Sequence, residues 1–234
     1  MKLPENKRRM EEGRTNWSIW IYGAPFSGKT TFADKFDNVL MINTDGNTRY
    51  TTAPYILIRN EIYKEGRMFK TKYGWDEFID TIAELEKDTT YETIVIDLID
   101  DIYSMARQSI CANHGWSHES DDSTKAWDIV RSEFIDVMRR LLTLPNKNKI
   151  LISHEDKSRN IMKSGGDQVT EIKPNIQDKV ANKIAGMVDV VGRVTADHKL
   201  SFEISRGVFG GGRIHKTLPK EIDLDKDEFL KAIV

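Results

Sequence analysis

Short apolar runs alternate with helical stripes of apolar residues along the first two thirds of the chain. The runs predict buried strands at 17–22, 39–42, 55–58, 93–97 and 149–152, because uninterrupted apolar runs of this length fit parallel strands covered on both faces. Apolar residues at helical spacing predict helices at 31–36, 75–87, 102–110 and 127–141. This alternation predicts an α/β fold with a mainly parallel central sheet and helices on both of its faces.

The pattern changes after residue 152. Polar residues 156–175 predict a mobile loop, and strands at 188–194 and 200–206 predict a C-terminal antiparallel hairpin. A short helix is predicted for 225–234. Residues 1–16 contain few apolar anchors and predict a flexible N-terminal arm. Because no linker composition interrupts the rest, we expect residues 17–234 to form one domain.

Composition narrows the class of protein. The hydrophobic content of 39% and the net charge of −2 in 234 residues are ordinary for a globular protein. No apolar run approaches the roughly 18 residues that span a bilayer, and the N-terminus lacks the apolar core of a signal peptide. The single cysteine, Cys111, excludes an intrachain disulfide. We therefore expect a cytoplasmic protein without a membrane partner.

A phosphate-binding motif stands between the first predicted strand and the first predicted helix. Residues 23–31 read Gly-Ala-Pro-Phe-Ser-Gly-Lys-Thr-Thr and match the pattern G-x-x-x-x-G-K-S/T. Gly23 and Gly28 let backbone N–H groups converge on phosphate oxygens. Lys29 supplies a cation for the β- and γ-phosphates, and the Thr30 hydroxyl is suited to ligate Mg²⁺. The N-terminus of the following helix adds a partial positive charge.

The motif predicts that the chain binds a nucleoside triphosphate. The residues expected to contact the nucleotide are Gly23, Ala24, Pro25, Phe26, Ser27, Gly28, Lys29, Thr30 and Thr31.

Hydrolysis requires more than a phosphate loop, and three strand ends offer the missing groups. Asp97 ends an apolar strand, where its carboxylate would face the loop and hold Mg²⁺ beside Thr30; the alternative is a strand-end cap. If strand 39–42 lies beside the strand of the loop, Asp45 reaches the attacking water as general base, although Asp-Gly is also a common turn pair. His154 either senses the γ-phosphate or is a plain strand-end polar residue.

The order of these elements resembles the RecA-like ATPase core of the P-loop NTPases. Residues 42–45 stand where that family has an aliphatic strand ending in the catalytic glutamate, 95–97 match its Walker B strand, and 151–154 match a strand ending in an amide sensor. Segments 188–193 and 210–213 look closer still to phage-encoded RecA-like ATPases of the single-strand-annealing type. Asp45 and His154 depart from the family's usual glutamate and glutamine.

The resemblance implies a DNA-stimulated ATPase that uses ATP and Mg²⁺, acts on single-stranded DNA in recombination, annealing or repair, and assembles into a ring or filament. A phage-encoded protein of this type would work in the host-cell cytoplasm. The resemblance also implies that loops at about 113–125 and 156–173 face DNA. An ordinary solvated loop is the alternative for both.

Candidate DNA contacts differ between the two loops. The loop at 156–173 carries Lys157, Arg159, Lys163 and Lys173, which are suited to phosphate contacts. Trp116, in the other loop, would stack on unpaired bases. The same loop also carries Glu119, Asp121 and Asp122, whose negative charges would repel DNA. Charge is also uneven, with 16 acidic against 6 basic residues over 73–142 and 11 basic against 8 acidic over 154–216. A polyanion would therefore meet the C-terminal half.

In RecA-like proteins a cation from a neighbouring subunit completes the nucleotide site. Arg206 and Arg213 are the candidates here, and structural ion pairing is the alternative for each.

Two other functions stay open at this level. One is a P-loop kinase that transfers a phosphoryl group to a nucleotide or another small molecule, although the 156–173 loop lacks the arginine-rich composition of a kinase lid. The other is a nucleotide switch with negligible turnover, which the departures at Asp45 and His154 permit. No base-specific motif distinguishes ATP from GTP, so ATP rests on the resemblance.

Overall fold

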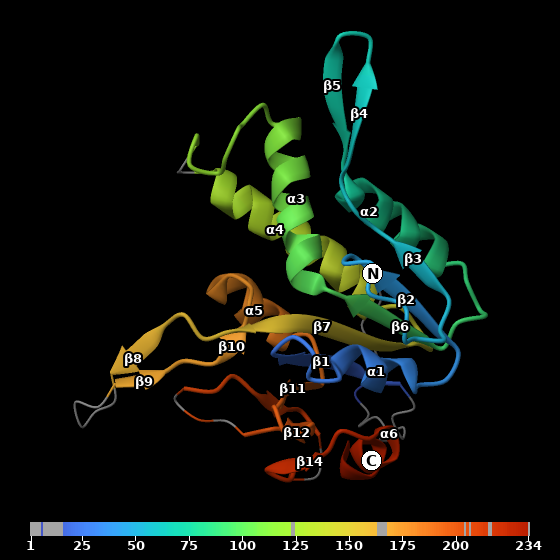
Figure 1. Ribbon diagram of the computed structural model, residues 1–234, viewed down its shortest axis with the longest axis vertical. Coiled ribbons are helices and arrows are strands. Elements are labelled where there is room, and N and C mark those ends of the chain that lie inside the picture. The colour runs from blue at the N-terminus through green and yellow to red at the C-terminus, as the bar shows by residue number, and fades with distance from the viewer. Residues whose placement is uncertain are drawn as a thin grey trace.

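The computed structural model describes residues 6, 16–122, 125–162, 168–203, 205, 207–214 and 217–233 (Figure 1). Most of the predicted N-terminal arm, together with the candidate residues Lys163 and Arg206, lies outside this described part of the chain.

A mainly parallel sheet forms the centre of the molecule. Its parallel strands are β1 (Ser18–Gly23), β2 (Val39–Asn43), β3 (Tyr55–Leu57), β6 (Thr93–Asp97), β7 (Asn148–Asp156) and β11 (Val190–Val194). They lie in the order β11-β1-β7-β6-β2-β3. All residues of β1, β2 and β6 are buried, as apolar strands covered on both faces require.

Antiparallel strands extend this sheet beyond β11. They are β12 (Lys199–Ser201), β13 (Gly211–Gly212) and β14 (Glu221–Asp223). A further short strand, β10 (Lys173–Pro174), pairs antiparallel with the end of β7. The pair β11–β12 is the predicted C-terminal hairpin, which is confirmed. Its second strand, β12, ends at Ser201 and is shorter than the predicted 200–206.

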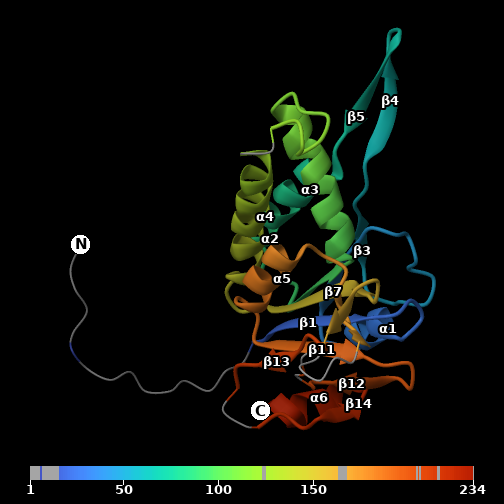
Figure 2. The ribbon, with the colours of Figure 1, turned by 90° about the vertical axis from the view of Figure 1, so that its left-hand side faces the viewer.

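Helices cover both faces of the sheet, as predicted. One face carries α2 (Gly74–Leu85), α3 (Ile99–Asn113), α4 (Ala126–Leu142) and α5 (Asp178–Ala185), and the other carries α1 (Lys29–Asp34) and α6 (Lys226–Ile233). Alternate residues of β1 divide between the two cores. Trp20 and Tyr22 pack beneath α2–α5, and Ile19 and Ile21 pack against α1 and α6. In Figure 2, α3 and α4 stand above β7, and α6 lies at the bottom.

Helix α5 and two further hairpins escape the sequence prediction. β4 (Glu61–Glu65) pairs with β5 (Met68–Lys72), and β8 (Asn160–Met162) pairs with β9 (Gln168–Thr170). The second lies in the segment predicted to be a mobile loop, so that prediction is wrong for the described residues around 160–170. Both hairpins project from the body (Figure 1). All residues of β4 and β5 are exposed, so these strands lack the buried apolar pattern from which strands are predicted.

Across the described ranges, no helix has both the length and the hydrophobicity needed to cross a bilayer.

Candidate nucleotide site

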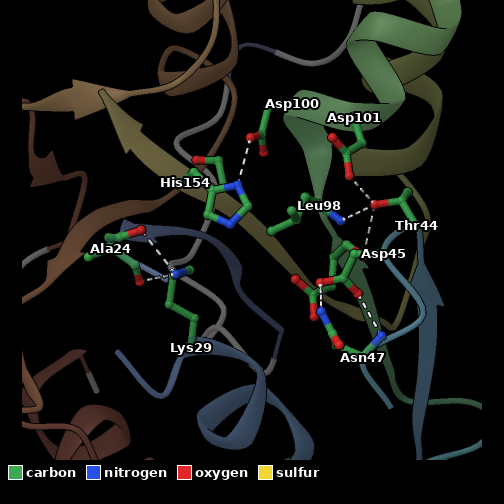
Figure 3. A network of polar contacts seen from close by, with 12 residues as sticks. Ala24, Lys29, Thr44, Asp45, Asn47, Leu98, Asp100, Asp101 and His154 are labelled. Carbon is green, nitrogen blue, oxygen red and sulfur yellow. Dashed lines mark hydrogen bonds and ion pairs between the residues drawn. The ribbon is translucent and has the colours of Figure 1, made fainter. Parts of the chain in front are cut away.

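The carboxyl ends of the parallel strands meet at one edge of the sheet. Gly23 of β1 lies opposite His154 of β7, and Asp97 of β6 lies opposite both Ile152 of β7 and Asn43 of β2. In open parallel sheets, ligands bind outside this edge. The strand register therefore brings the phosphate loop, His154, Asp97 and the segment after Asn43 to one place. Figure 3 shows Lys29, Asp45 and His154 at this place.

The phosphate loop is shaped by its two glycines. A Cβ on Gly23 would lie 2.5 Å from the Val194 carbonyl oxygen, so only glycine fits where the loop leaves β1 beside β11. Gly28 has φ 93° and precedes the first residue of α1, a left-handed conformation that favours glycine. Phe26 is fully exposed, whereas Ser27 is buried. The loop therefore presents its backbone and little else to a ligand.

Lys29 is folded back onto its own loop. Its Nζ donates to the carbonyl oxygens of Gly23 at 3.0 Å and Ala24 at 2.7 Å (Figure 3). Burial lowers the pKa of Lys29, and the nearby carboxylate of Asp97 partly opposes this shift. A triphosphate would offer this ammonium charged acceptors, which form stronger hydrogen bonds than carbonyl groups.

Thr30 and Asp97 face each other across the sheet edge. The Thr30 hydroxyl donates to Oδ2 of Asp97 at 2.8 Å, although the two residues stand on strand–helix junctions 67 positions apart. Asp97 is buried, and this burial raises its pKa to about 6. The hydrogen bond from Thr30 lowers the pKa by less than burial raises it. The next peptide bond, Asp97–Leu98, is cis.

This oxygen pair fits Mg²⁺. Hydroxyl and carboxylate oxygens are hard ligands, and Mg²⁺ on a nucleotide is held by one or two protein groups together with phosphates and water. The described residues contain no group of three or more His, Cys, Asp or Glu side chains arranged to hold a metal by themselves. Thr30 and Asp97 would therefore hold the ion only in company with the nucleotide's phosphates.

Asp45 follows a strand that lies elsewhere than the sequence analysis supposed. β2 pairs with β6 and β3, and both β6 and β7 separate it from β1, so the premise that this strand adjoins the phosphate-loop strand is wrong. Asp45 nevertheless stands at the same edge (Figure 3). Asn43 and Asn47 donate to its carboxylate at 2.8 to 3.0 Å. Partial burial alone would raise the Asp45 pKa, but these hydrogen bonds outweigh it and hold the pKa below the ordinary value.

His154 is held by an acid that the sequence analysis missed. Its Nδ1 lies 3.3 Å from Oδ2 of Asp100, in the first turn of α3 (Figure 3). This hydrogen bond raises the pKa of His154, although partial burial opposes it. The other carboxylate oxygen of Asp100 is buried without a hydrogen-bond partner in the described part of the chain. The sequence could have indicated Asp100, because it follows Asp97 by three residues. That spacing places Asp100 in the first turn of the helix after the strand.

A second acid of α3 is also part of this network. Asp101 accepts a hydrogen bond from the Thr44 hydroxyl at 2.7 Å, and the backbone N–H of Leu98 donates to the same hydroxyl at 3.0 Å (Figure 3). Thr44 thereby joins the segment of Asp45 to the start of α3.

The turn between β11 and β12 closes on the phosphate loop from the other side. Nδ1 of His198 lies 3.0 Å from the Ser27 carbonyl oxygen, and the Leu224 side chain approaches Gly28. Nothing in the local sequence indicates that His198 reaches the loop, because the contact joins residues 171 positions apart.

The predicted DNA contacts are paired with acids. Lys157 lies 2.5 Å from Glu155, Arg159 lies 3.1 Å from Asp178, and Lys173 lies 2.5 Å from Asp178. These partners neutralise much of the positive charge from which the prediction started.

Trp116 and Arg213 lie away from the site edge. Trp116 is half-buried and stacks on His114 just beyond the far end of α3, about 20 Å of helix from Asp97. Arg213 follows β13, which pairs with the start of β11, and its guanidinium donates to the Gly186 carbonyl at 2.6 Å. The structure thus places Arg213 at the sheet end opposite to the phosphate loop of its own chain.

Comparison with known proteins gives a family match. Residues 15–222 match the model of a family described as the AAA domain. Among similar solved structures, the RadB recombinase is 15% identical, with 76% of this chain and 73% of that chain covered at a TM-score of 0.37. An ATPase from the type III secretion system of pathogenic bacteria is 14% identical, with 84% of this chain and 57% of that chain covered at a TM-score of 0.46. No curated protein matches the chain.

Proposed function

Because the chain belongs to the AAA domain family, whose model matches residues 15–222, we propose that it is a Mg²⁺-dependent ATPase that acts on single-stranded DNA. The observation that carries the nucleotide part is the 2.8 Å contact between the Thr30 hydroxyl and the Asp97 carboxylate. It joins the phosphate loop to the strand end that an NTPase uses for its metal. The DNA part rests on the resemblance to RecA-like ATPases of recombination, annealing and repair.

The residues of the site divide the work of hydrolysis. Lys29 exchanges the loop carbonyls for phosphate oxygens, and Thr30 and Asp97 hold Mg²⁺. The ion, when bound, neutralises charge on the β- and γ-phosphate oxygens. Because Nδ1 of His154 donates to the Asp100 carboxylate, Nε2 donates to the γ-phosphate only in the imidazolium form, which the raised pKa of His154 favours. Oδ1 of Asp45 accepts two hydrogen bonds, whereas Oδ2 accepts one and retains a lone pair. Oδ2 of this ionised carboxylate therefore orients the attacking water and accepts its proton.

ATP hydrolysis with and without single-stranded DNA tests the function. We expect turnover that requires Mg²⁺, rises with DNA and is lost in Lys29→Ala. Lys231→Ala is the matched control, since that lysine is exposed on α6 and is expected to leave turnover unchanged. Turnover that requires a small-molecule acceptor would instead favour the kinase, and absence of turnover under every condition would favour the nucleotide switch.

Asp45→Asn separates binding from chemistry. The amide keeps an oxygen for the Asn47 backbone N–H but loses the negative charge and the proton-accepting lone pairs. We expect nucleotide affinity to change less than about threefold and turnover to fall by about 10² or more. Equilibrium binding of a fluorescent ATP analogue and single-turnover hydrolysis measure the two quantities. Unchanged turnover would remove Asp45 from the mechanism.

Self-association into a ring or filament is the last part of the proposal. Arg213 lies at the sheet end opposite to its own phosphate loop, so it can complete a nucleotide site only in another copy of the chain. This position supports an inter-subunit role for Arg213. Arg213→Ala is expected to lower turnover without lowering nucleotide affinity in the isolated chain.

A further inference from the structure

The β4–β5 hairpin exposes apolar side chains that it has no means to bury. The exposed fractions of Ile62 and Phe69 are both 74%, and that of Met68 is 65%. All residues of both strands are exposed. Two strands alone are marginally stable in water and need an apolar face packed on another surface. The hairpin rises from the body in both views (Figures 1 and 2). Its exposed apolar patch therefore indicates a site that binds another molecule.

One face of the hairpin combines apolar and basic groups without an acid. The pairs Ile62–Thr71 and Lys64–Phe69 place these four side chains on the same face. Arg67 stands in the adjoining turn. Among the described residues, neither Lys64 nor Arg67 has an ion-pair partner. The partner surface should therefore have an apolar floor and acidic groups beside it.

The same chain carries a groove of this character. A cavity of about 680 Å³ lies between α2 and the outer strands β2 and β3, with Leu40, Ile56 and Leu85 in its apolar floor. Carboxylates of Glu77, Asp80, Glu84 and Asp88 line it. Lysines already pair with three of them, Lys87 with Glu84, Lys147 with Asp88 and Lys72 with Glu77. Glu77, Asp80 and Glu84 follow one another at helical spacing and so share a side of α2. Asp80 has no ion-pair partner in the described part of the chain.

Only the base of the hairpin contacts the groove of its own chain, through Lys72 and Glu77 at 3.8 Å, and the apolar part of the hairpin lies farther out. The hairpin joins the N-terminal end of α2 at Gly74 and rises away from the body, with strands of five residues that span about 17 Å. The groove runs in the other direction, along α2 toward Leu85 and Asp88. A protrusion at one end and its complement toward the other are the two halves of a head-to-tail contact.

We propose that the β4–β5 hairpin of one copy docks into the α2–β3 groove of a second copy. Ile62 and Phe69 cover the apolar floor, and Lys64 and Arg67 meet the carboxylates of Asp80 and Glu84. Because the two surfaces differ, each copy keeps one hairpin and one groove free for further copies, and repetition builds a ring or a filament. The inference deepens the self-association part of the proposed function and does not depend on hydrolysis.

Site-directed cross-linking tests which surfaces meet. Cys111 is buried, so the unmodified chain is a suitable background and a negative control for a short bis-maleimide. A mixture of Phe69→Cys with Asp80→Cys is expected to give a cross-linked heterodimer. A mixture of Phe69→Cys with Lys231→Cys, whose cysteine lies on α6, is the matched control and is expected to give none. Cross-linking of Phe69→Cys mainly to itself would mean that hairpins pair with each other, and would overturn the proposal.

Charge reversal tests the energetics. Lys64→Glu with Arg67→Glu is expected to weaken association by about tenfold or more, as measured by sedimentation. Addition of Asp80→Lys and Glu84→Lys in the same chain is expected to restore it. If Lys64→Glu with Arg67→Glu abolishes binding of a single-stranded oligonucleotide and leaves the distribution of oligomers in sedimentation unchanged, the hairpin binds nucleic acid. That result would overturn the proposal. Absence of ATP hydrolysis in the unmodified protein would contradict the proposed function. The sedimentation measurements would still test association, because they do not depend on hydrolysis.

Discussion

Asp97 is the side chain at which the demands of folding and of metal binding oppose each other. It is 3% exposed, and burial raises its pKa to about 6 from the ordinary value of 3.8. The folded state therefore holds the carboxyl proton more tightly than the unfolded chain does. That contribution to stability is fully present below about pH 4 and is lost as the pH rises through about 6. The ionised group that Mg²⁺ requires is thus a destabilising one before the ion binds.

Asp97→Asn should consequently stabilise the metal-free protein. The asparagine retains an acceptor for the Thr30 hydroxyl and is neutral at every pH. The difference between a pKa of about 6 and the ordinary 3.8 corresponds to about 3 kcal/mol. We therefore expect a gain of about 1 to 3 kcal/mol at pH 7.5 that disappears near pH 4. Urea unfolding in the presence of a chelator measures it, and Mg²⁺-dependent nucleotide binding should be lost in the same variant. A variant less stable than the parent at pH 7.5 would contradict this account.

At the scale of elements, the strand–loop–helix unit around the phosphate loop is the part most fully constrained. β1 is buried between β7 and β11, and its last residue passes so close to Val194 that a Cβ on Gly23 would meet a backbone oxygen at 2.5 Å. A backbone atom cannot rotate away as a side chain would. The start of the loop is therefore fixed by the neighbouring strand as much as by the motif itself.

Gly23→Ala is expected to destabilise the fold by about 1 to 3 kcal/mol, the usual cost of overpacking, and to weaken nucleotide binding at least tenfold. Urea unfolding and a nucleotide titration measure the two effects. Gly115→Ala is the matched control, because Gly115 has φ 73° with no atom near its Cβ position. It should cost about 1 kcal/mol from backbone strain alone and leave nucleotide binding intact. Equal loss of binding in both variants would mean that global destabilisation is responsible.

The whole molecule consists of a central sheet with two apolar cores and hairpins that project from it. The cores lie on opposite faces of the same strands, and the β4–β5 hairpin belongs to neither. Its stem is already closed beneath it, since Gly74 donates to the Asn60 side chain at 2.9 Å. The organisation of residues 17–234 as one domain stays a prediction.

Replacement of Glu61–Lys72 by a short Gly-Ser linker should therefore leave the stability of the isolated chain within about 0.5 kcal/mol of the parent, because no buried contact is lost. Thermal unfolding at low protein concentration measures this. At high concentration, where copies associate, the parent should unfold at a higher temperature than the shortened protein. A large loss of stability at low concentration would show that the hairpin packs on its own chain.

The amino-acid sequence alone determined the alternation of strands and helices up to about residue 152, the two-faced covering of the sheet and the phosphate loop. These features depend on local spacing. The apolar periods of 2 residues for a strand and 3.6 for a helix, and the nine-residue motif, can each be recognised within a short segment of the chain. The same locality predicted that Asp45, Asp97 and His154 stand at strand ends. Asp97 ends β6 and Asp45 follows β2, but β7 continues past His154 to Asp156, so the strand-end prediction is wrong for His154.

Only the tertiary structure decided the order of the strands, which puts β7 between β1 and β6 and places β2 outside them. It also decided that Asp100 holds His154, that His198 reaches Ser27, and that acids pair with Lys157, Arg159 and Lys173. Most of these contacts join residues far apart in the chain, and their energies depend on burial and distance. Neither quantity is a property of a short stretch of sequence, so the candidate site was predictable as a set of strand ends and not as a geometry.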